Sequence, residues 1–346
     1  MRIINDEISL SKLDDLRDVF YSKICPLNKN NKSFNAKYSA GKLEKLTKNN
    51  RDPYYEIYNY LFLHKETIYK GIPSELEQFN VDIIDFANRI GLKDFLDNTD
   101  CNSKLNSAFI TSYETFRNGG TENYVQDWFK TLNLKTCPYC NRNWISSSLD
   151  RDGKTNKLYF DIDHFYPKGT FPWLAVSFYN LIPACTICNQ REKGERELKS
   201  KDHLHPFVED FDNIVKFEVP INEIDDFVSN KKPIVLNLVP RKPFTSTSDL
   251  YKRAINTYNF FNLKNLYDTH LDYVKEILQK EMIYSPEYIK QLSSIENVKT
   301  KTKIFQNEDE VKRMIFSNYV LASQIHERPL AKLTKDLLED FSLRKY

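Results

Sequence analysis

The sequence predicts an α+β protein in which helix-rich flanks surround a compact ββα-type centre. Three observations lead to this prediction. Apolar residues recur at helical spacing near both ends of the chain, two short β-type runs lie near its middle, and two Cys-x-x-Cys pairs bracket both runs. The expected division is a helical region over 1–130, a cysteine-framed core over 131–210, and a region of short strands followed by helices over 211–346.

Helical spacing dominates the N-terminal region and returns near the C-terminus. Apolar residues repeat every three or four positions from Leu10 to Ile24 and again from Tyr54 to Tyr69, and Ser107–Leu132 predicts two helices broken at Gly119-Gly120. The expected C-terminal helices are Leu250–Phe260, Leu263–Met282, Pro286–Ile295, Glu308–Ile325 and Leu330–Phe341.

The middle of the chain has a β-type pattern. Trp144–Ser148 and Leu158–Phe165 are short strand candidates, and the polar stretch between them contains Asp152-Gly153, a strong turn signal, so a hairpin is expected. Two more strands are expected further on, and a helix should begin near Cys188. The later strand candidates are Ile214–Val219 and Ile234–Leu238.

Composition favours a soluble globular protein. Of 346 residues, 40% are hydrophobic and 28% charged. There is no apolar run long enough to span a membrane, and the opening MRIINDEISL lacks the basic-then-apolar order of a signal peptide, so a cytoplasmic location without membrane association is expected. The net charge of +2 does not by itself indicate a nucleic-acid partner. Residues 21–51, with seven lysines and Arg51 against Glu44, fit either a phosphate-binding surface or a solvated segment.

The four paired cysteines predict a structural zinc site. A Cys-x-x-Cys turn presents two thiolates at the spacing that tetrahedral Zn²⁺ requires, and two such pairs complete a closed site with no open position for catalysis. In a chain without a secretory signal, this pattern favours metal ligation over disulfides. The alternative is that the pairs are unrelated thiols. The predicted ligands are Cys137, Cys140, Cys185 and Cys188.

An Asp-His dipeptide between the cysteine pairs carries the chemistry expected of phosphodiester hydrolysis. His164 has an imidazole suited to general-base work near neutral pH, and Asp163 offers a hard oxygen that suits Mg²⁺. Asn189 follows Cys188 where a helix should begin, and its amide oxygen could complete a metal shell. Taken alone, Asn189 would more readily be a helix N-cap, and Asp163 and His164 would more often be ordinary surface or hydrogen-bonded core residues.

This stretch resembles the HNH endonuclease family, whose ββα-metal fold carries His-x-x-Pro, often after Asp, then Asn, then His or Asn on a helix, frequently framed by Cys-x-x-Cys pairs. Asp163-His164-Phe165-Tyr166-Pro167, Asn180 and Asn189 match in order over about sixty residues. The resemblance implies that His164 is the general base, that Asp163 and Asn189 bind one Mg²⁺ or Mn²⁺, and that Asn180 orders the loop behind the base. Asn189 stands where many members have His.

A looser likeness extends to HNH proteins of bacterial anti-phage systems, such as Septu and retron-associated effectors, which work beside an ATPase. It rests on the phrases DHFYPK and NLIPACTICNQREKG in a chain with long flanks. It implies a role in antiviral defence and a partner that is an ATPase or a second copy of the chain.

Several basic and histidine side chains lie near the motif in sequence. Four cations are candidates for holding phosphates, although each would fit a solvated surface position as well. His203 and His205 would serve either as an extra ligand or, as we favour, in packing and hydrogen bonding. The four candidate phosphate contacts are Arg142, Lys168, Arg191 and Lys193.

The sequence therefore predicts a metal-dependent HNH endonuclease that acts on nucleic acid, with DNA expected ahead of RNA. The competing hypothesis is a non-catalytic zinc module that binds nucleic acid or a partner protein. That alternative accounts for the cysteines and the basic segment, but it gives Asp163, His164 and Asn189 no reason to occur together.

Overall fold

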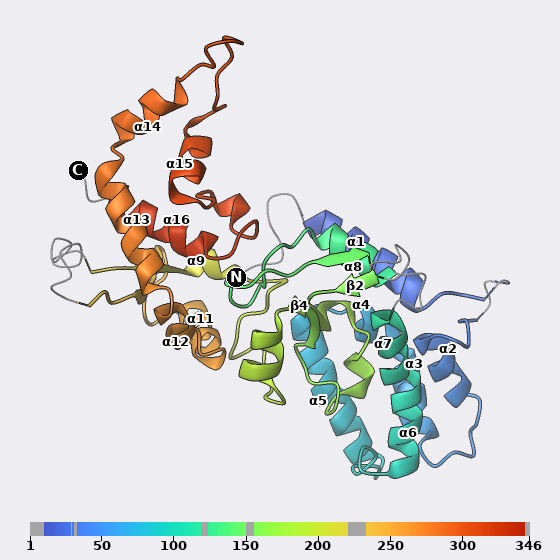
Figure 1. The fold of residues 1–346 in the computed structure, drawn as a ribbon. Coiled ribbons are helices and arrows are strands. Elements are labelled where there is room, and N and C mark those ends of the chain that lie inside the picture. Colours follow the sequence, from blue (N-terminus) through green and yellow to red (C-terminus); the bar gives the residue numbers. More distant parts are fainter. Residues whose placement is uncertain are drawn as a thin grey trace. The chain divides into compact units, whose positions relative to one another are not determined.

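A computed structural model describes the chain except for residues 1–9, 29, 31–32, 119–123, 150–155, 221–232 and 343–346 (Figure 1). The expected break at Gly119-Gly120 and the expected turn at Asp152-Gly153 lie outside the described residues. The described chain forms two compact units: residues 10–133 with 146–208, and residues 134–145 with 209–342. No helix in these described ranges is long and apolar enough to cross a membrane.

Helices make up most of the first unit. In α5, apolar residues at helical spacing are buried, among them Leu76, Phe79 and Ile83. Glu75 accepts a hydrogen bond from the backbone N of Ile72 at 2.9 Å, which satisfies one of the free donors at the start of this helix. The helices are α1 (Leu10–Ile24), α2 (Ser39–Leu46), α3 (Tyr55–Leu63), α4 (Lys65–Lys70), α5 (Pro73–Arg89), α6 (Thr99–Ala108), α7 (Ile110–Arg117) and α8 (Tyr124–Leu132).

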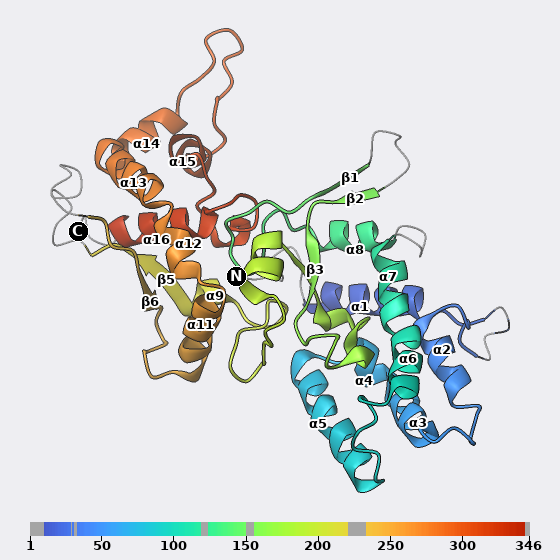
Figure 2. The same cartoon turned by 60° about the horizontal axis from the view of Figure 1, so that its bottom comes forward.

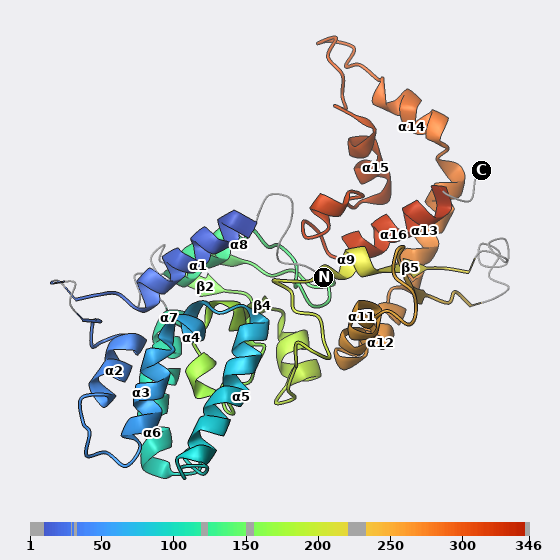
Figure 3. The same cartoon turned by 180° about the vertical axis from the view of Figure 1, so that it is seen from behind.

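Aromatic side chains join these helices to the segment that carries the motif. Phe20 of α1 packs edge-on against Phe116 of α7 and Phe178, with ring centroids 5.4 and 5.5 Å apart. Trp173 stacks near Phe95, and its indole N donates to the Asn80 side chain of α5 at 2.8 Å. Figure 3 shows α3, α5 and α6 of this unit from the back. The segment that follows the Asp-His dipeptide therefore packs against the helices of the first unit.

The central strands differ from the expected pair. β1 (Ser147–Leu149) and β2 (Asn156–Leu158) form an antiparallel hairpin, but β2 overlaps the second expected strand, Leu158–Phe165, only at Leu158, and most of that range belongs to a separate strand, β3 (Asp161–His164). β3 pairs antiparallel with β4 (Leu181–Ala184), a segment that the sequence did not assign to a strand. Two short 3₁₀ turns, η1 (Pro172–Leu174) and η2 (Phe178–Asn180), connect them, and the π-helix η3 (Ile187–Lys193) follows β4.

The second unit combines one small sheet with helices (Figure 2). The expected helix Leu263–Met282 is two helices, and the expected helix Glu308–Ile325 ends at Phe316, because Ser317 has a left-handed backbone with φ of 56°. The elements are α9 (Phe211–Ile214), β5 (Val215–Glu218), β6 (Asn237–Pro240), α11 (Asp249–Phe260), α12 (Leu263–Asp268), α13 (Leu271–Ile283), α14 (Pro286–Ser293), α15 (Glu308–Phe316), η4 (Ala322–Gln324) and α16 (Ala331–Ser342).

A buried network of charged side chains ties α16 to α9 and β5. Lys332 donates to Asp212 at 2.8 Å, to Asp336 at 2.7 Å and to the carbonyl of Val215 at 2.9 Å. Lys335 lies 3.1 Å from the second carboxylate oxygen of Asp212. Each cation in this network has an anionic partner, as charges removed from water require.

Candidate functional site

The first cysteine pair lies in a tight turn of the second unit. Asn141 follows Cys140 with a left-handed φ of 50°, and its backbone N donates to the carbonyl of Cys137 at 2.8 Å. The backbone N of Arg142 points to the sulfur of Cys140 at 3.4 Å, and the side chain of Asn143 does so at 3.7 Å. Donors directed at sulfur favour the thiolate, which is the metal-binding form.

The second cysteine pair joins β4 to η3. The backbone N of Cys188 donates to the sulfur of Cys185 at 3.5 Å, so this pair too has a backbone donor directed at sulfur. All four cysteines are buried, and their sulfur atoms lie within 4.8 Å of one another. A tetrahedron with Zn–S bonds of about 2.3 Å places its sulfurs about 3.8 Å apart. The four thiols are therefore close enough to hold a metal ion such as zinc.

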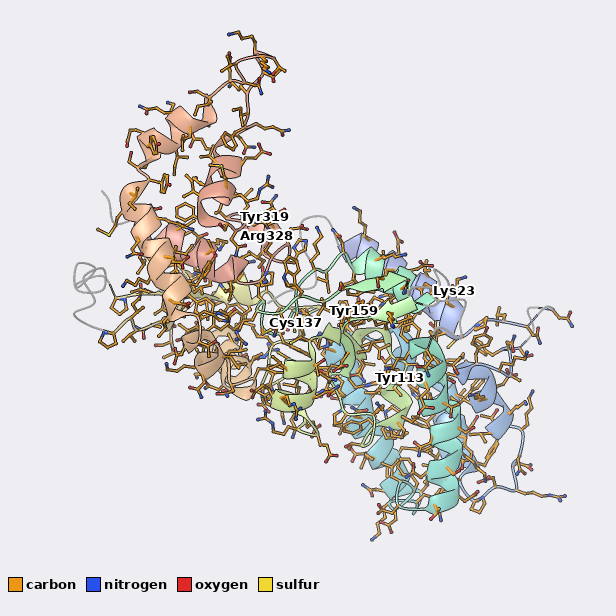
Figure 4. All side chains as sticks on the ribbon, in the orientation of Figure 1. Lys23, Tyr113, Cys137, Tyr159, Tyr319 and Arg328 are labelled. Atoms are coloured by element: carbon orange, nitrogen blue, oxygen red, sulfur yellow. The ribbon has the colours of Figure 1, made fainter. Side chains whose placement is uncertain are left out.

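Asp163 and His164 leave opposite faces of β3, because successive side chains of a strand alternate. His164 is 6% exposed and packs against the edge of the Tyr113 ring, with centroids 4.4 Å apart. Tyr113 belongs to α7 and is labelled in Figure 4. The ammonium of Lys168 lies over the same ring at 4.8 Å. The expected base and one expected phosphate contact therefore share a neighbour.

The hydrogen bond of His164 fixes which ring nitrogen can accept a proton. Nε2 lies 3.0 Å from the carbonyl oxygen of Ala175. A carbonyl can only accept, so Nε2 carries the hydrogen and Nδ1 is the basic nitrogen. Burial, with the positive charge of Lys168, lowers the pKa of His164 to about 3, although the bond to Ala175 acts in the opposite direction. The imidazole is therefore neutral at neutral pH, which is the form a general base needs.

Asn180 holds the loop that follows β3. Its side-chain oxygen accepts from the backbone N of Tyr166 at 2.7 Å, and its side-chain nitrogen donates to the carbonyls of Tyr166 and Leu174 at 3.0 and 2.9 Å. The residue is fully buried. These three bonds fix the loop between His164 and η1.

The face of β3 opposite His164 meets η3 in two layers. In the first, Asn189 and Gln190 donate to Oδ2 of Asp161 at 3.1 and 2.9 Å. In the second, Lys193 donates to Oδ1 of Asp163 at 2.6 Å. The structure thus brings Asn189 to Asp161 and Lys193 to Asp163. The sequence predicts instead that Asn189 and Asp163 bind the same ion.

Asp161 contacts the predicted site, yet sequence reasoning did not single it out. Asp161 and Asp163 are two positions apart, so both carboxylates lie on the same face of β3. Carboxylate oxygens, and an amide oxygen such as that of Asn189, are the kinds of ligand that Mg²⁺ prefers, although the Asn189 amide faces Asp161 through its nitrogen. By residue chemistry alone, Asp161, Asp163 and Asn189 are compatible with such an ion. The Asp-x-Asp spacing on a predicted strand was the available signal.

The other candidates have varied surroundings. The guanidinium of Arg142 donates to His270 at 3.0 Å and to Thr269 at 3.3 Å within the second unit. Arg191 is exposed on η3. His205 is buried against Phe165, with ring centroids 4.3 Å apart. That contact agrees with the packing role favoured for His205.

Comparison with known proteins gives a distant relative. The chain is 29% identical over 115 residues to the Septu protein PtuB of Bacillus thuringiensis, an alignment that covers 32% of this chain and 41% of that protein. The match therefore spans less than half the length of the curated relative. No family model matches the chain. No solved structure matches it.

Proposed function

We propose that the chain is a metal-dependent HNH endonuclease that hydrolyses phosphodiester bonds, with DNA expected ahead of RNA. One observation carries this proposal: at the end of β3 a neutral imidazole of fixed tautomer, His164, directly follows the carboxylate of Asp163, and η3 brings Asn189 against the same strand. Phosphodiester hydrolysis needs both a general base and charge stabilisation at the phosphate.

Each side chain has a defined task in this proposal. Nδ1 of His164 takes the proton of the attacking water, while the bond from Nε2 to Ala175 keeps the ring oriented. Asp163, Asp161 and Asn189 would hold a Mg²⁺ or Mn²⁺, which when bound supplies the positive charge that stabilises the leaving oxygen. Asn180 keeps the loop behind the base in place. Arg191 and Lys168 are proposed phosphate contacts.

Supercoiled plasmid, linear duplex, single-stranded DNA and RNA, each incubated with Mg²⁺, Mn²⁺ or EDTA, test the activity. We expect cleavage with either ion, none in EDTA, and none in a His164→Ala variant. His64→Ala is the matched control, because His64 also bonds a backbone carbonyl, that of Tyr60 at 2.8 Å, but lies in the helical region. Equal loss in both variants, or cleavage that persists in EDTA, would refute the proposal.

We also propose that Cys137, Cys140, Cys185 and Cys188 bind one structural Zn²⁺. Because zinc binding contributes to folding, Cys185→Ser should give unfolded or insoluble protein. Cys101→Ser is the control, since Cys101 is also buried but belongs to α6. Metal analysis should find about one zinc per chain. Soluble, folded wild-type protein without zinc would disprove this assignment.

The relationship to a Septu protein supports a role in anti-phage defence. In that role we expect the chain to work with an ATPase or with a second copy of itself. Co-expression with a neighbouring ATPase gene, followed by phage infection, would test this. Protection that is retained in the His164→Ala variant would separate the defence role from nuclease activity.

A further inference from the structure

The ammonium of Lys193, which belongs to η3, lies against the last two residues of β3. It donates to Oδ1 of Asp163 at 2.6 Å and also to the backbone carbonyl of His164. Lys193 is 4% exposed and Asp163 is 3% exposed. Lysine is rarely buried this deeply unless it is paired, so this contact is a specific feature of the site.

Lys193 comes from the same helix as the proposed ion ligand Asn189. The two residues are four positions apart on η3, and η3 packs against β3, which carries Asp161 and Asp163. π-Helical turns of this kind recur at functional sites. Lys193 is the last residue of η3, and Gly194 after it has a left-handed φ of 54°. The side chain of Lys193 therefore extends from the C-terminal end of η3.

A divalent cation and the Lys193 ammonium would use the same carboxylate. Both carry positive charge, and two cations on one carboxylate repel each other at short range in a site shielded from water. Each cation therefore weakens the binding of the other to Asp163, and a divalent cation should bind more tightly when the ammonium moves away. A phosphate group nearby would offer the ammonium a new anionic partner, since lysine is a flexible point charge that binds phosphate well.

We propose that Lys193 is a positioning residue that competes with the divalent cation for Asp163, and that the phosphodiester backbone of the substrate releases Asp163 by attracting Lys193. Metal binding and nucleic-acid binding are then coupled. This inference rests on the proposed nuclease function, but it concerns ion binding, which can be measured without cleavage. The site is loaded fully only when nucleic acid is present.

The test measures Mn²⁺ binding by electron paramagnetic resonance in a His164→Ala background, which prevents cleavage. Lys193→Met should bind Mn²⁺ at least about fivefold more tightly than its parent, the low end of typical coupling between sites. Lys199→Met is the matched control, because Lys199 contacts Glu197 and not Asp163. An unchanged or weaker affinity in folded Lys193→Met would overturn the proposal.

A short DNA duplex should then raise the Mn²⁺ affinity of the parent but not that of Lys193→Met. The Asp163→Asn variant with the same duplex measures the Mn²⁺ bound by DNA alone. By thermodynamic reciprocity, Mn²⁺ should tighten duplex binding by the same factor in the parent. Equal effects of the duplex on the parent and on Lys193→Met would contradict the coupling.

A second measurement uses wild-type protein, in case Lys193→Met does not fold. Acetylation of lysines, read by mass spectrometry, should modify Lys193 slowly without Mn²⁺ and several-fold faster with it, because displacement exposes the amine. Lys264, which is exposed on α12, should not respond. No change at Lys193 would refute the competition. If no nucleic acid is cleaved but Lys193 still responds, the nuclease proposal alone fails.

Discussion

Lys193 in the first unit and Lys332 in the second are both buried lysines paired with carboxylates, yet their surroundings differ. Lys332 donates to two carboxylates and a carbonyl, and one of these carboxylates, Asp336, also accepts from the backbone N of Phe217 at 2.9 Å. Lys193 donates to one carboxylate and to the carbonyl of the proposed base.

The difference shows how the same residue types serve either stability or chemistry. The Lys332 network joins a helix, a strand and a short helix through mutually satisfied charges, so removing one charge unbalances its buried partners. The Lys193 pair lies beside a half-buried layer formed by Asp161 and Asn189, where amide donors can rearrange. We expect the first cluster to hold the fold and the second to respond to ions.

The largest effect should come from Lys332→Met. Asp212 and Asp336 would lose their shared cation inside the unit, and breaking a buried pair costs about 3–5 kcal/mol. Urea unfolding followed by circular dichroism measures the change. A loss below about 1 kcal/mol would mean that Lys335 and Arg241 replace Lys332, and the comparison would lose its basis.

Asp163→Asn should have a smaller effect on stability. The amide oxygen can still accept from Lys193, but the buried ammonium loses its carboxylate, so we expect a cost of about 3 kcal/mol, the low end for breaking a buried ion pair. The wild-type protein should melt at a higher temperature when Mn²⁺ is added, and the variant should not. Thermal denaturation with and without Mn²⁺ measures both effects. A variant that still responds to Mn²⁺ would place the ion elsewhere.

Acid should weaken the Lys332 network next. Burial would raise the pKa of Asp212, but Lys332 and Lys335 outweigh it and hold that pKa below its usual value. The unfolded chain then binds a proton that the folded chain does not, so stability is present above pH ~4 and falls at about 1.4 kcal/mol per pH unit below it. Unfolding free energies from pH 7 to pH 3 should show a shallower loss in Lys332→Met.

The smallest effect should follow from Lys264→Met. Lys264 and Asp268 form an exposed pair at 2.9 Å on α12, one helical turn apart. Pairs of this type contribute about 0.3–0.5 kcal/mol. The same urea experiment provides the baseline for removing a lysine charge. A loss comparable with that of Lys332→Met would show that charge removal alone, and not burial, destabilises this unit.

Sequence reasoning reached the parts of the site that depend on local spacing. Each cysteine pair has the spacing of a short turn. The four sulfur atoms lie together, as expected of two pairs that share one metal ion. C-terminal helices such as α11 and α14 agree with their expected ranges to within about two residues, since helical periodicity is local. The roles assigned to His164, Asn180 and Asn189 remain predictions.

Pairings between distant segments could not be derived in the same way. β4 lacks the alternation of a half-exposed strand because all four of its residues are buried. The burial of Lys193 was not evident, because a lysine four residues beyond Asn189 fits a solvated helix face equally well until its partner is known. The contact between Tyr319 and Arg328 is likewise not evident from the sequence. The two residues are labelled side by side in Figure 4, and the guanidinium lies 5.2 Å from the ring.

The antiparallel register of β3 sets a limit on how this protein can diversify. Asp163 lies opposite Ile182 and His164 opposite Leu181. Inserting or deleting one residue within β3 would turn the imidazole toward η3 and a carboxylate toward Tyr113, exchanging the two chemical faces at once. In the stretch between His164 and Asn180, Ala175 and the partners of Asn180 are held by hydrogen bonds, whereas Gly169 and Thr170 are exposed and lie outside these contacts. We expect length variation among relatives to accumulate at Gly169 and Thr170 and to be absent from the strand.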